Sequence, residues 1–452
     1  MQTKHDITSG NIAPILFRMA LGMLIGHIAL TAFNLTDTYF VSKLGTLELA
    51  AMSYTFPVVM LVNHFLFGIG LGTSATIAKA IGQKDFSEAK RISTDSLFLI
   101  IATGTLFGVV GLFTIRPIFY ALGARGETLE LVIKYMRICC YGMPISAIAM
   151  VIDNAIRATG DTKTPGLIIA FNVSLNAVLD PVFIFGFAGI PAMGIEGAAI
   201  ATMIARIIGS TCTVSFMHFK MRMFDFNGTK PGVTLQSWKK VLRLGIPVSF
   251  ALMLMPVSQA IVTRITAFYG DPAVAALGAG GKIDSLALMG IFSLSSVIIP
   301  FTGQNLGAGR IDRVSDVLRL CEKFSLYWGL LIFAIFLVFR IPIAGVFTED
   351  PLVLKYISAY MVINSLSFPA VGGSVMCSNV INGLQKPIRT TMLHFMRTII
   401  FLVPAVWLCG KIWQAEGIFI GIAGVNIVSF FIYHAVAKRT IEESRQNSKE
   451  VE

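Results

Sequence analysis

Long apolar stretches separated by short polar segments run through the whole sequence. Twelve of them reach the roughly 20 residues that a helix needs to cross a bilayer. They lack the two-residue alternation of polar and apolar positions that is typical of a membrane β-barrel strand. The pattern therefore predicts an all-α polytopic membrane protein with twelve transmembrane helices, at about residues 14–41, 49–81, 91–115, 130–156, 165–187, 194–219, 239–268, 275–306, 314–339, 352–381, 387–409 and 416–437.

The charge distribution sets the expected orientation of these spans. Only 13 % of the residues are charged, about half of the roughly 25 % that is usual in soluble domains. The net charge is +11, and Lys and Arg gather in alternate loops, as the positive-inside rule describes. We therefore expect a multi-pass protein of the inner (cell) membrane, embedded in the lipid bilayer, with both termini cytoplasmic. The basic charge follows from topology, so no nucleic-acid partner is expected.

The cysteines suggest no metal or disulfide chemistry. There are six, none in a CxxC pair and most within apolar stretches: Cys139, Cys140, Cys212, Cys321, Cys377 and Cys409. This spacing predicts neither a disulfide framework nor a zinc site. The first apolar stretch follows the N-terminus directly, without a cleavable signal peptide. The chain also lacks the HExxH and GxSxG motifs of two large enzyme classes, and we expect no cofactor.

Glycine and proline positions indicate an internal repeat with an offset of 225 residues. Pro117 pairs with Pro342, Tyr135 with Tyr360, and Pro144 with Pro369. Six spans per copy make the two repeats parallel. We expect a first lobe at 1–220, a solvated basic linker at 221–238, a second lobe at 239–437 and a cytoplasmic tail at 438–452. Parallel repeats recur in alternating-access transporters, with the substrate site between the lobes.

The polar residues of the fifth predicted span form one face of a helix. Asn172, Asn176 and Asp180 are spaced i, i+4, i+8. A carboxylate in the membrane costs about 2.5–3.5 kcal/mol on insertion scales and usually lies on a transport pathway. Pro181 also removes one backbone hydrogen bond from this helix. The alternative is a polar patch that only holds two helices together.

A second carboxylate is expected at the same depth. Asp37 lies six residues before Lys43, about 9 Å from the outer loop, and Asp180 lies nine residues before Gly189. Asn34 shares the face of Asp37. Burial and a neighbouring carboxylate both favour the protonated form, so such a dyad would take up protons as a unit.

The fourth span carries Tyr135 and Asp153, which are five turns apart on one face. Tyr135 is either a site residue or an interfacial belt tyrosine. Asp153 is either a site residue or the partner of Arg157, four residues later.

The second lobe lacks the acidic pair. Val262 and Leu402 occupy the positions that match Asp37 and Asp180. Arg264 and Asp284 lie at comparable depth, and we expect a structural salt bridge between them. Coupling should then be confined to the first lobe.

Five segments carry a resemblance to a known family: Asp37–Gly45, Gly82–Ala89, Arg157–Pro165, Asn176–Pro181 and Gly194–Thr202. Together they resemble the multidrug and toxic compound extrusion (MATE) family. The resemblance implies a V-shaped, two-lobed transporter that exchanges drugs for cations by alternating access, and not an enzyme.

Within the family the chain looks DinF-like. That branch has an acidic residue on helix 1, Asn-x-x-x-Asp on helix 5 and a site tyrosine, matched here by Asp37, Asn176, Asp180 and Tyr135. The NorM-like branch has acidic residues on helices 7 and 10, where this chain has Gln259 and Asn379. Relatives often carry proline on helix 1 where this chain has Gly22, so bending driven by proline is not expected.

The sequence thus predicts a monomeric, proton-coupled exporter of amphipathic drugs or toxic organic cations. Asp37 and Asp180 would couple transport to protons, and five residues would line the site: Asn34, Tyr135, Asn172, Asn176 and Asp153. Three alternatives remain open: a sodium-coupled exporter, a lipid-linked oligosaccharide flippase, and an intramembrane lipid-modifying enzyme. The flippase would need a more cationic cavity, and the enzyme a DDxxD cluster that the chain lacks.

Overall fold

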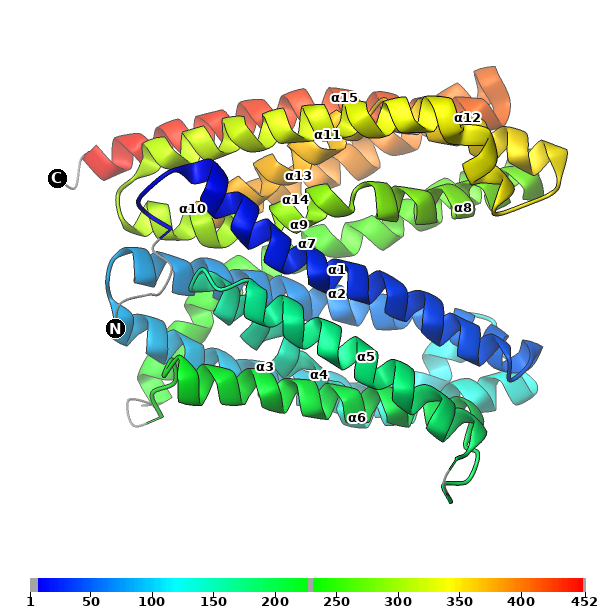
Figure 1. Cartoon of the computed structure of the whole chain (residues 1–452), viewed down its shortest axis with the longest axis horizontal. Coiled ribbons are helices and arrows are strands. Elements are labelled where there is room, and N and C mark those ends of the chain that lie inside the picture. The colour runs from blue at the N-terminus through cyan, green and yellow to red at the C-terminus, as the bar shows by residue number, and fades with distance from the viewer. Residues whose placement is uncertain (1–6, 188, 227–230, 450–452) are drawn as a thin grey trace. The chain divides into compact units, whose positions relative to one another are not determined.

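The computed structural model describes residues 7–187, 189–226 and 231–449, and within them every regular element is a helix (Figure 1). Fifteen α-helices are accompanied by three short π or 3-10 segments. In chain order the elements are α1 (Ile12–Ser42), α2 (Thr46–Gly82), α3 (Phe86–Ala121), α4 (Gly126–Ala158), α5 (Lys163–Phe185), α6 (Gly194–Ser215), η1 (Phe216–Lys220), α7 (Pro231–Thr266), η2 (Ala267–Tyr269), α8 (Asp271–Ala287), α9 (Met289–Ser295), α10 (Ile298–Gly307), α11 (Ile311–Gly345), α12 (Pro351–Ser365), α13 (Phe368–Gly383), α14 (Pro387–Phe395), η3 (Met396–Leu402) and α15 (Val403–Lys449).

These helices account for the twelve predicted spans. Among the described residues nine helical stretches are long and apolar enough to cross a membrane, and two bent pairs bring the number to 11. The last stretch, Pro387–Ser448, covers two predicted spans. Trp413 and Gln414 leave the helical conformation in α15, between the segments predicted at 387–409 and 416–437. The fold class is therefore confirmed.

The chain forms two compact units. Unit 1 contains Leu21–Ser249, and unit 2 contains Ile7–Ala20 together with the chain from Phe250 onward. Because these boundaries fall inside α1 and α7, each of these two helices contributes to both units.

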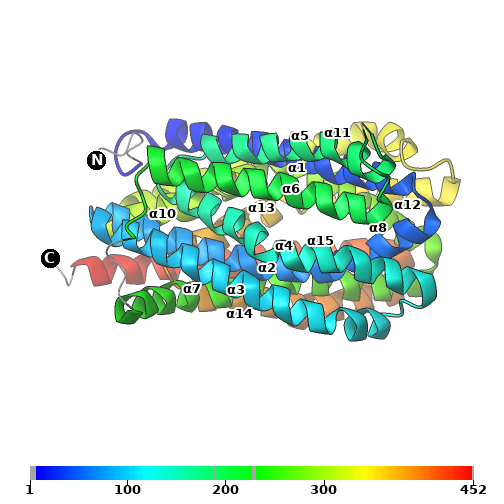
Figure 2. The same cartoon turned by 90° about the horizontal axis from the view of Figure 1, so that it is seen from below.

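In unit 1, glycines allow helices to approach closely. A Cβ atom at Gly22 of α1 would lie 2.9 Å from the backbone nitrogen of Lys163, at the start of α5. A Cβ atom at Gly68 would lie 2.5 Å from the backbone nitrogen of Ser249, and one at Gly72 would lie 2.6 Å from that of Gly245. Small residues permit this backbone contact between membrane helices. Helices α5 and α6 also pack side by side (Figures 1 and 2).

The same contact occurs in both units and supports the predicted repeat. In unit 1 a Cβ atom at Gly104 of α3 would lie 2.7 Å from Cα of Pro144 in α4. In unit 2 a Cβ atom at Gly329 of α11 would lie 2.5 Å from Cδ of Pro369 in α13. Gly329 and Pro369 follow Gly104 and Pro144, respectively, by 225 residues. The copies differ in shape, since α4 continues through Pro144, whereas α12 and α13 meet at a bend of 52° just before Pro369.

The segment predicted as a solvated linker is anchored to α3 within unit 1. Helix α7 already begins at Pro231. Thr234 donates to Oδ1 of the buried Asp95 at 2.9 Å, and the indole of Trp238 donates to the Asp95 carbonyl at 2.8 Å. The backbone nitrogen of Asp225 donates to Thr94 Oγ1 at 2.8 Å. The expectation of a solvated connector is wrong for these residues, because they donate to two buried acceptors of Asp95, Oδ1 and the backbone oxygen.

Candidate functional site

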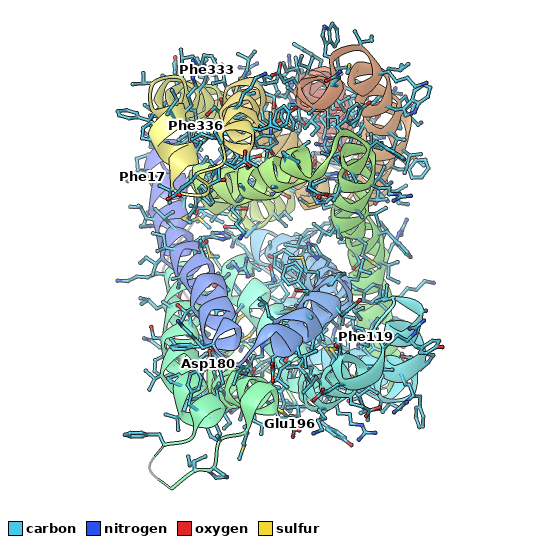
Figure 3. The ribbon with its side chains drawn as sticks, turned by 90° about the vertical axis from the view of Figure 1, so that its right-hand side faces the viewer. Phe17, Phe119, Asp180, Glu196, Phe333 and Phe336 are labelled. Atoms are coloured by element: carbon cyan, nitrogen blue, oxygen red, sulfur yellow. The ribbon has the colours of Figure 1, made fainter. Side chains whose placement is uncertain are left out.

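Asp180 lies inside unit 1 (Figure 3), on the face of α5 that packs against α6, with none of its surface exposed. Asn176, one turn earlier, is 3 % exposed. With its amide nitrogen turned towards Asp180, Asn176 donates to Asp180 Oδ2 at 2.9 Å. Its amide oxygen then accepts from the backbone nitrogen and the hydroxyl of Thr202 on α6, at 3.0 and 3.2 Å. The orientation of an amide is set by such partners, and in this orientation both the nitrogen and the oxygen of the Asn176 amide have a partner.

Asn172 continues the same face towards α6. A Cβ atom at Gly209 would lie 2.2 Å from Asn172 Nδ2, so this amide occupies space that only glycine leaves free. Gly209 and Thr202 are about two turns apart on α6, and Asn172 and Asn176 are about one turn apart on α5. The predicted single face of three polar residues is therefore formed, and Asn172 and Asn176 both contact α6.

The backbone of α1 runs parallel to α5 in unit 1. Gly22 approaches Lys163, Gly26 approaches Gly166, and the rings of Phe40 and Phe185 are 6.4 Å apart. The residue numbers of these three pairs differ by 140 to 145.

Asp37 and Asp180 differ by 143 in residue number, so this register places Asp37 in α1 level with Asp180 in α5. The side chains of Asn34 and Asp37 lie outside the described residues.

Tyr135 and Asp153 of α4 have their α6 neighbours on opposite sides of Thr202, well away from it. Tyr135 packs against a cluster that contains Ile195, about 10 Å before Thr202 along the helix. Asp153 is buried and its Oδ1 accepts from Thr213 at 3.2 Å, about 16 Å beyond Thr202. The structure thus brings Asn176 and Asp180 together with Thr202. Thr202 was not among the site residues predicted from the sequence.

The predicted pairing of Asp153 with Arg157 is found as an electrostatic interaction between the two buried groups, without a direct ion-pair contact. Arg157 Nε donates to the backbone oxygen of Asp153 at 3.3 Å, and no described ion pair joins their side chains. The hydroxyl of Thr213 is the described donor to the carboxylate, because α6 packs directly against α4.

Unit 2 contains a carboxylate cluster that the sequence did not reveal. Asp284 Oδ2 on α8 accepts from the Tyr360 hydroxyl at 2.7 Å and from Asn364 Nδ2 at 2.9 Å, both on α12. Asn364 Nδ2 also contacts the Tyr360 hydroxyl oxygen at 2.9 Å. The i, i+4 spacing of Tyr360 and Asn364 in an apolar segment was the available signal.

The salt bridge expected between Arg264 and Asp284 is absent from the described ion pairs. The guanidinium of Arg264 lies 5.6 Å from the ring centre of Phe268, one turn later in the chain. A cation over an aromatic ring within about 6 Å is a favourable arrangement. The prediction was wrong because each residue finds its partner elsewhere: Arg264 on its neighbouring ring and Asp284 on α12.

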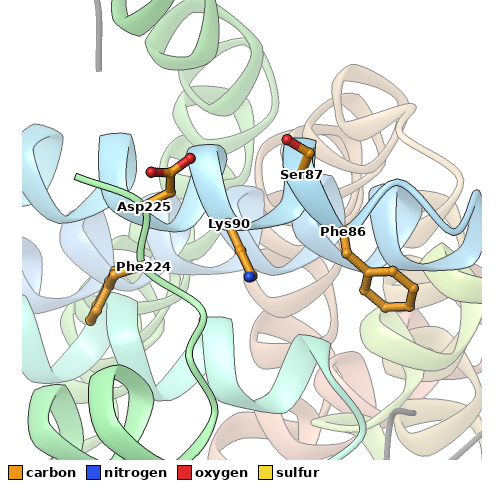
Figure 4. Close-up of a pocket in the computed structure, with 5 residues that line it drawn as sticks. All are labelled: Phe86, Ser87, Lys90, Phe224 and Asp225. Carbon is orange, nitrogen blue, oxygen red and sulfur yellow. The ribbon is translucent and has the colours of Figure 1, made fainter. Parts of the chain in front are cut away.

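A small pocket lies where the first turns of α3 meet the segment after η1 (Figure 4). It is lined by Phe86, Ser87, Lys90, Phe224 and Asp225. None of the predicted site residues is among them. It belongs to the anchored linker of unit 1 rather than to the Asp180 cluster.

Comparison with known proteins gives consistent matches. The MatE family profile matches residues 23–182 and again 247–408, so the two matches begin 224 residues apart. A relative from Shewanella oneidensis, described as an FAD transporter, is 30 % identical over 442 residues, which are 98 % of each chain. The multidrug export protein MepA of Staphylococcus aureus is 25 % identical over 87 % of this chain and 89 % of its own.

The fold also matches solved structures. The Vibrio cholerae MATE transporter VcmN in its bent form gives a TM-score of 0.91 at 28 % identity, over 96 % of this chain and 98 % of that one. A MATE structure in a straight conformation gives 0.89 at 25 % identity, over 97 % and 98 %. Because the profile matches both halves and a relative matches nearly the whole length, the chain belongs to the MATE family of multi-pass membrane transporters and is not an enzyme.

Proposed function

We propose that the chain is a proton-coupled exporter of amphipathic or cationic organic compounds, working by alternating access. The observation that carries the proposal is the full burial of Asp180, supported by the α1–α5 register, in which facing pairs differ by 140 to 145 in residue number and Asp37 and Asp180 by 143. A carboxylate buried in a membrane transporter is costly and is typical of a proton or ion pathway. The DinF-like resemblance of Asp37, Asn176 and Asp180 supports the same role.

The chemistry assigned to Asp180 follows from its partners. Asn176 donates to one carboxylate oxygen, a contact whose strength depends on the charge of that oxygen. Protonation from outside removes the charge and weakens this contact, so the packing of α1 against α5 changes and substrate affinity falls. Release of the proton inward restores the contact. Coupling requires that the proton binds differently to the two conformations.

Two features of the chain favour variants of this proposal. Asp180, the amide oxygen of Asn176 and the Thr202 hydroxyl gather oxygen atoms, which hard cations such as sodium prefer. The relative described as an FAD transporter favours a flavin dinucleotide as substrate. We place the protein in the inner membrane with both termini cytoplasmic, on the positive-inside distribution of its charges. We further propose that it works as a monomer.

The test is efflux from proteoliposomes of the purified full chain under separate proton and sodium gradients. A cationic dye and FAD are compared as substrates. Asp37→Asn and Asp180→Asn should each lower proton-driven efflux by about tenfold or more. Asp312→Asn, which changes an exposed carboxylate, should leave efflux unchanged. Full efflux in both site variants would refute the dyad, and efflux driven by sodium alone would refute proton coupling.

A further inference from the structure

Three potential metal ligands from three helices meet inside unit 2. They are Glu322 on α11, Cys377 on α13 and His434 on α15. One ligand atom from each lies within 4.8 Å of the other two. We propose that these three side chains form a binding site for a divalent transition-metal ion of the zinc type. The proposal is independent of the substrate and of the coupling ion.

The geometry suits tetrahedral coordination. Cys377 Sγ and His434 Nδ1 both approach the same oxygen, Glu322 Oε1, at 3.6 and 2.5 Å. Zinc bonds of about 2.3 Å to sulfur and 2.1 Å to oxygen at tetrahedral angles put these two ligand atoms about 3.6 Å apart. The sulfur–oxygen distance therefore already fits. The distance between His434 Nδ1 and Glu322 Oε1 must increase by about 0.9 Å when the metal ion replaces the proton of that hydrogen bond.

The donor set selects the class of ion. Thiolate and imidazole ligands suit zinc and similar ions, whereas magnesium and calcium prefer all-oxygen sites. A thiolate, a carboxylate and a neutral imidazole carry two negative charges, which balance a divalent ion in a low-dielectric interior. Binding sends the thiol proton to water and requires His434 Nδ1 to be unprotonated. Three protein ligands leave the fourth position to a water molecule.

The surroundings are those of a built interior site. Cys377 is completely buried, and the side chains of Glu322 and His434 are 16 % and 28 % exposed. Helices α11, α13 and α15 pack against one another pairwise. An ion held by all three would cross-link them and stabilise unit 2. The scattered cysteines predicted no zinc site, because the ligands are 55 and 57 residues apart and share no linear motif.

Cobalt spectroscopy of the purified full chain tests the site. After removal of any histidine tag and of bound metal, one equivalent of cobalt should give a thiolate-to-cobalt charge-transfer band and the visible bands of tetrahedral cobalt. Zinc should displace it, and magnesium should not. Zinc should also raise the apparent unfolding temperature in detergent.

Matched variants make the test specific. Cys377→Ser keeps the size and a hydrogen-bond donor for Glu322 but should lose the charge-transfer band. His434→Gln should weaken cobalt binding by more than the roughly 10–100-fold that is typical of changes outside the coordination shell. Cys140→Ser, which alters a buried thiol of unit 1, should behave as the wild type. An unchanged spectrum in Cys377→Ser, or no tetrahedral spectrum in the wild type, would overturn the proposal.

Discussion

The two units each hold a carboxylate inside the helical bundle, but at positions that the repeat does not relate. In unit 1 Asp180 is on α5 and is contacted by Asn176 of its own helix, which bridges to Thr202 of α6. In unit 2 Asp284 is on α8 and accepts from Tyr360 and Asn364 of α12. The repeat thus preserves the helical scaffold, while the charged residues have been placed independently in each copy.

The tyrosines show how this difference arises. Tyr135 and Tyr360 are equivalent at the offset of 225. Tyr135 packs in an apolar cluster together with Val59, and the residue equivalent to Val59 is Asp284, which Tyr360 contacts at 2.7 Å. The same tyrosine position thus faces apolar Val59 in unit 1 and the Asp284 carboxyl group in unit 2. The glycine–proline contacts, by contrast, are kept in both copies because backbone proximity leaves no room for other side chains.

The largest expected effect is the difference in efflux rate between variants of the two carboxylates. Asp180→Asn should lower proton-driven efflux by about tenfold or more, equivalent to ~1.4 kcal/mol, because the group that exchanges the proton is lost. Asp284→Asn should keep most of the efflux, since Tyr360 and Asn364 still hydrogen-bond an amide oxygen. Initial rates in proteoliposomes measure both. The reverse order would move the coupling site to unit 2.

Close packing of α1 on α5 is tested by Gly22→Ala. The added methyl group would lie 2.9 Å from the Lys163 backbone, and overpacking of this kind costs about 1–3 kcal/mol. The apparent unfolding temperature in detergent should therefore fall. Gly278→Ala in α8 is the matched control, because a Cβ atom there has no neighbour within 4 Å. Equal melting curves for the two variants would contradict the contact.

The Asp284 cluster is probed by Tyr360→Phe. Loss of this hydrogen bond leaves a buried acceptor with one partner fewer, which should destabilise the protein by about 1–3 kcal/mol. Tyr356→Phe, which changes another tyrosine of α12, provides the comparison. A double-mutant cycle with Asp284→Asn should show coupling between Tyr360 and Asp284. Strict additivity would mean that the hydroxyl does not stabilise the carboxylate.

The smallest expected effect concerns the anchored linker. Trp238→Phe removes the hydrogen bond to the Asp95 carbonyl but keeps an aromatic ring, so stability should fall by about 1 kcal/mol. Thermal melts followed by circular dichroism measure it. Trp328→Phe removes the corresponding indole bond to the Ala287 carbonyl in unit 2 and should cost a similar amount. A linker that is free in solution would show no effect for Trp238.

The sequence by itself determined the helical membrane class, the twelve spans and the repeat. In a bilayer only helices or closed barrels satisfy the backbone polar groups of a long apolar stretch, and these stretches lack the alternation of barrel strands. The polar face of Asn172, Asn176 and Asp180 was also predictable, because residues four apart share a helical face.

The tertiary structure alone decided which polar groups meet. Thr202 joins Asn176, Asp284 joins Tyr360 rather than Arg264, and the linker binds Asp95. The Glu322, Cys377 and His434 cluster likewise joins residues on three helices. Helical periodicity fixes the direction of a side chain on its own helix, but partners on other helices depend on packing. Local sequence spacing carries no information about those neighbours, so the sequence predicted single faces and the packing of the helices determined the pairs.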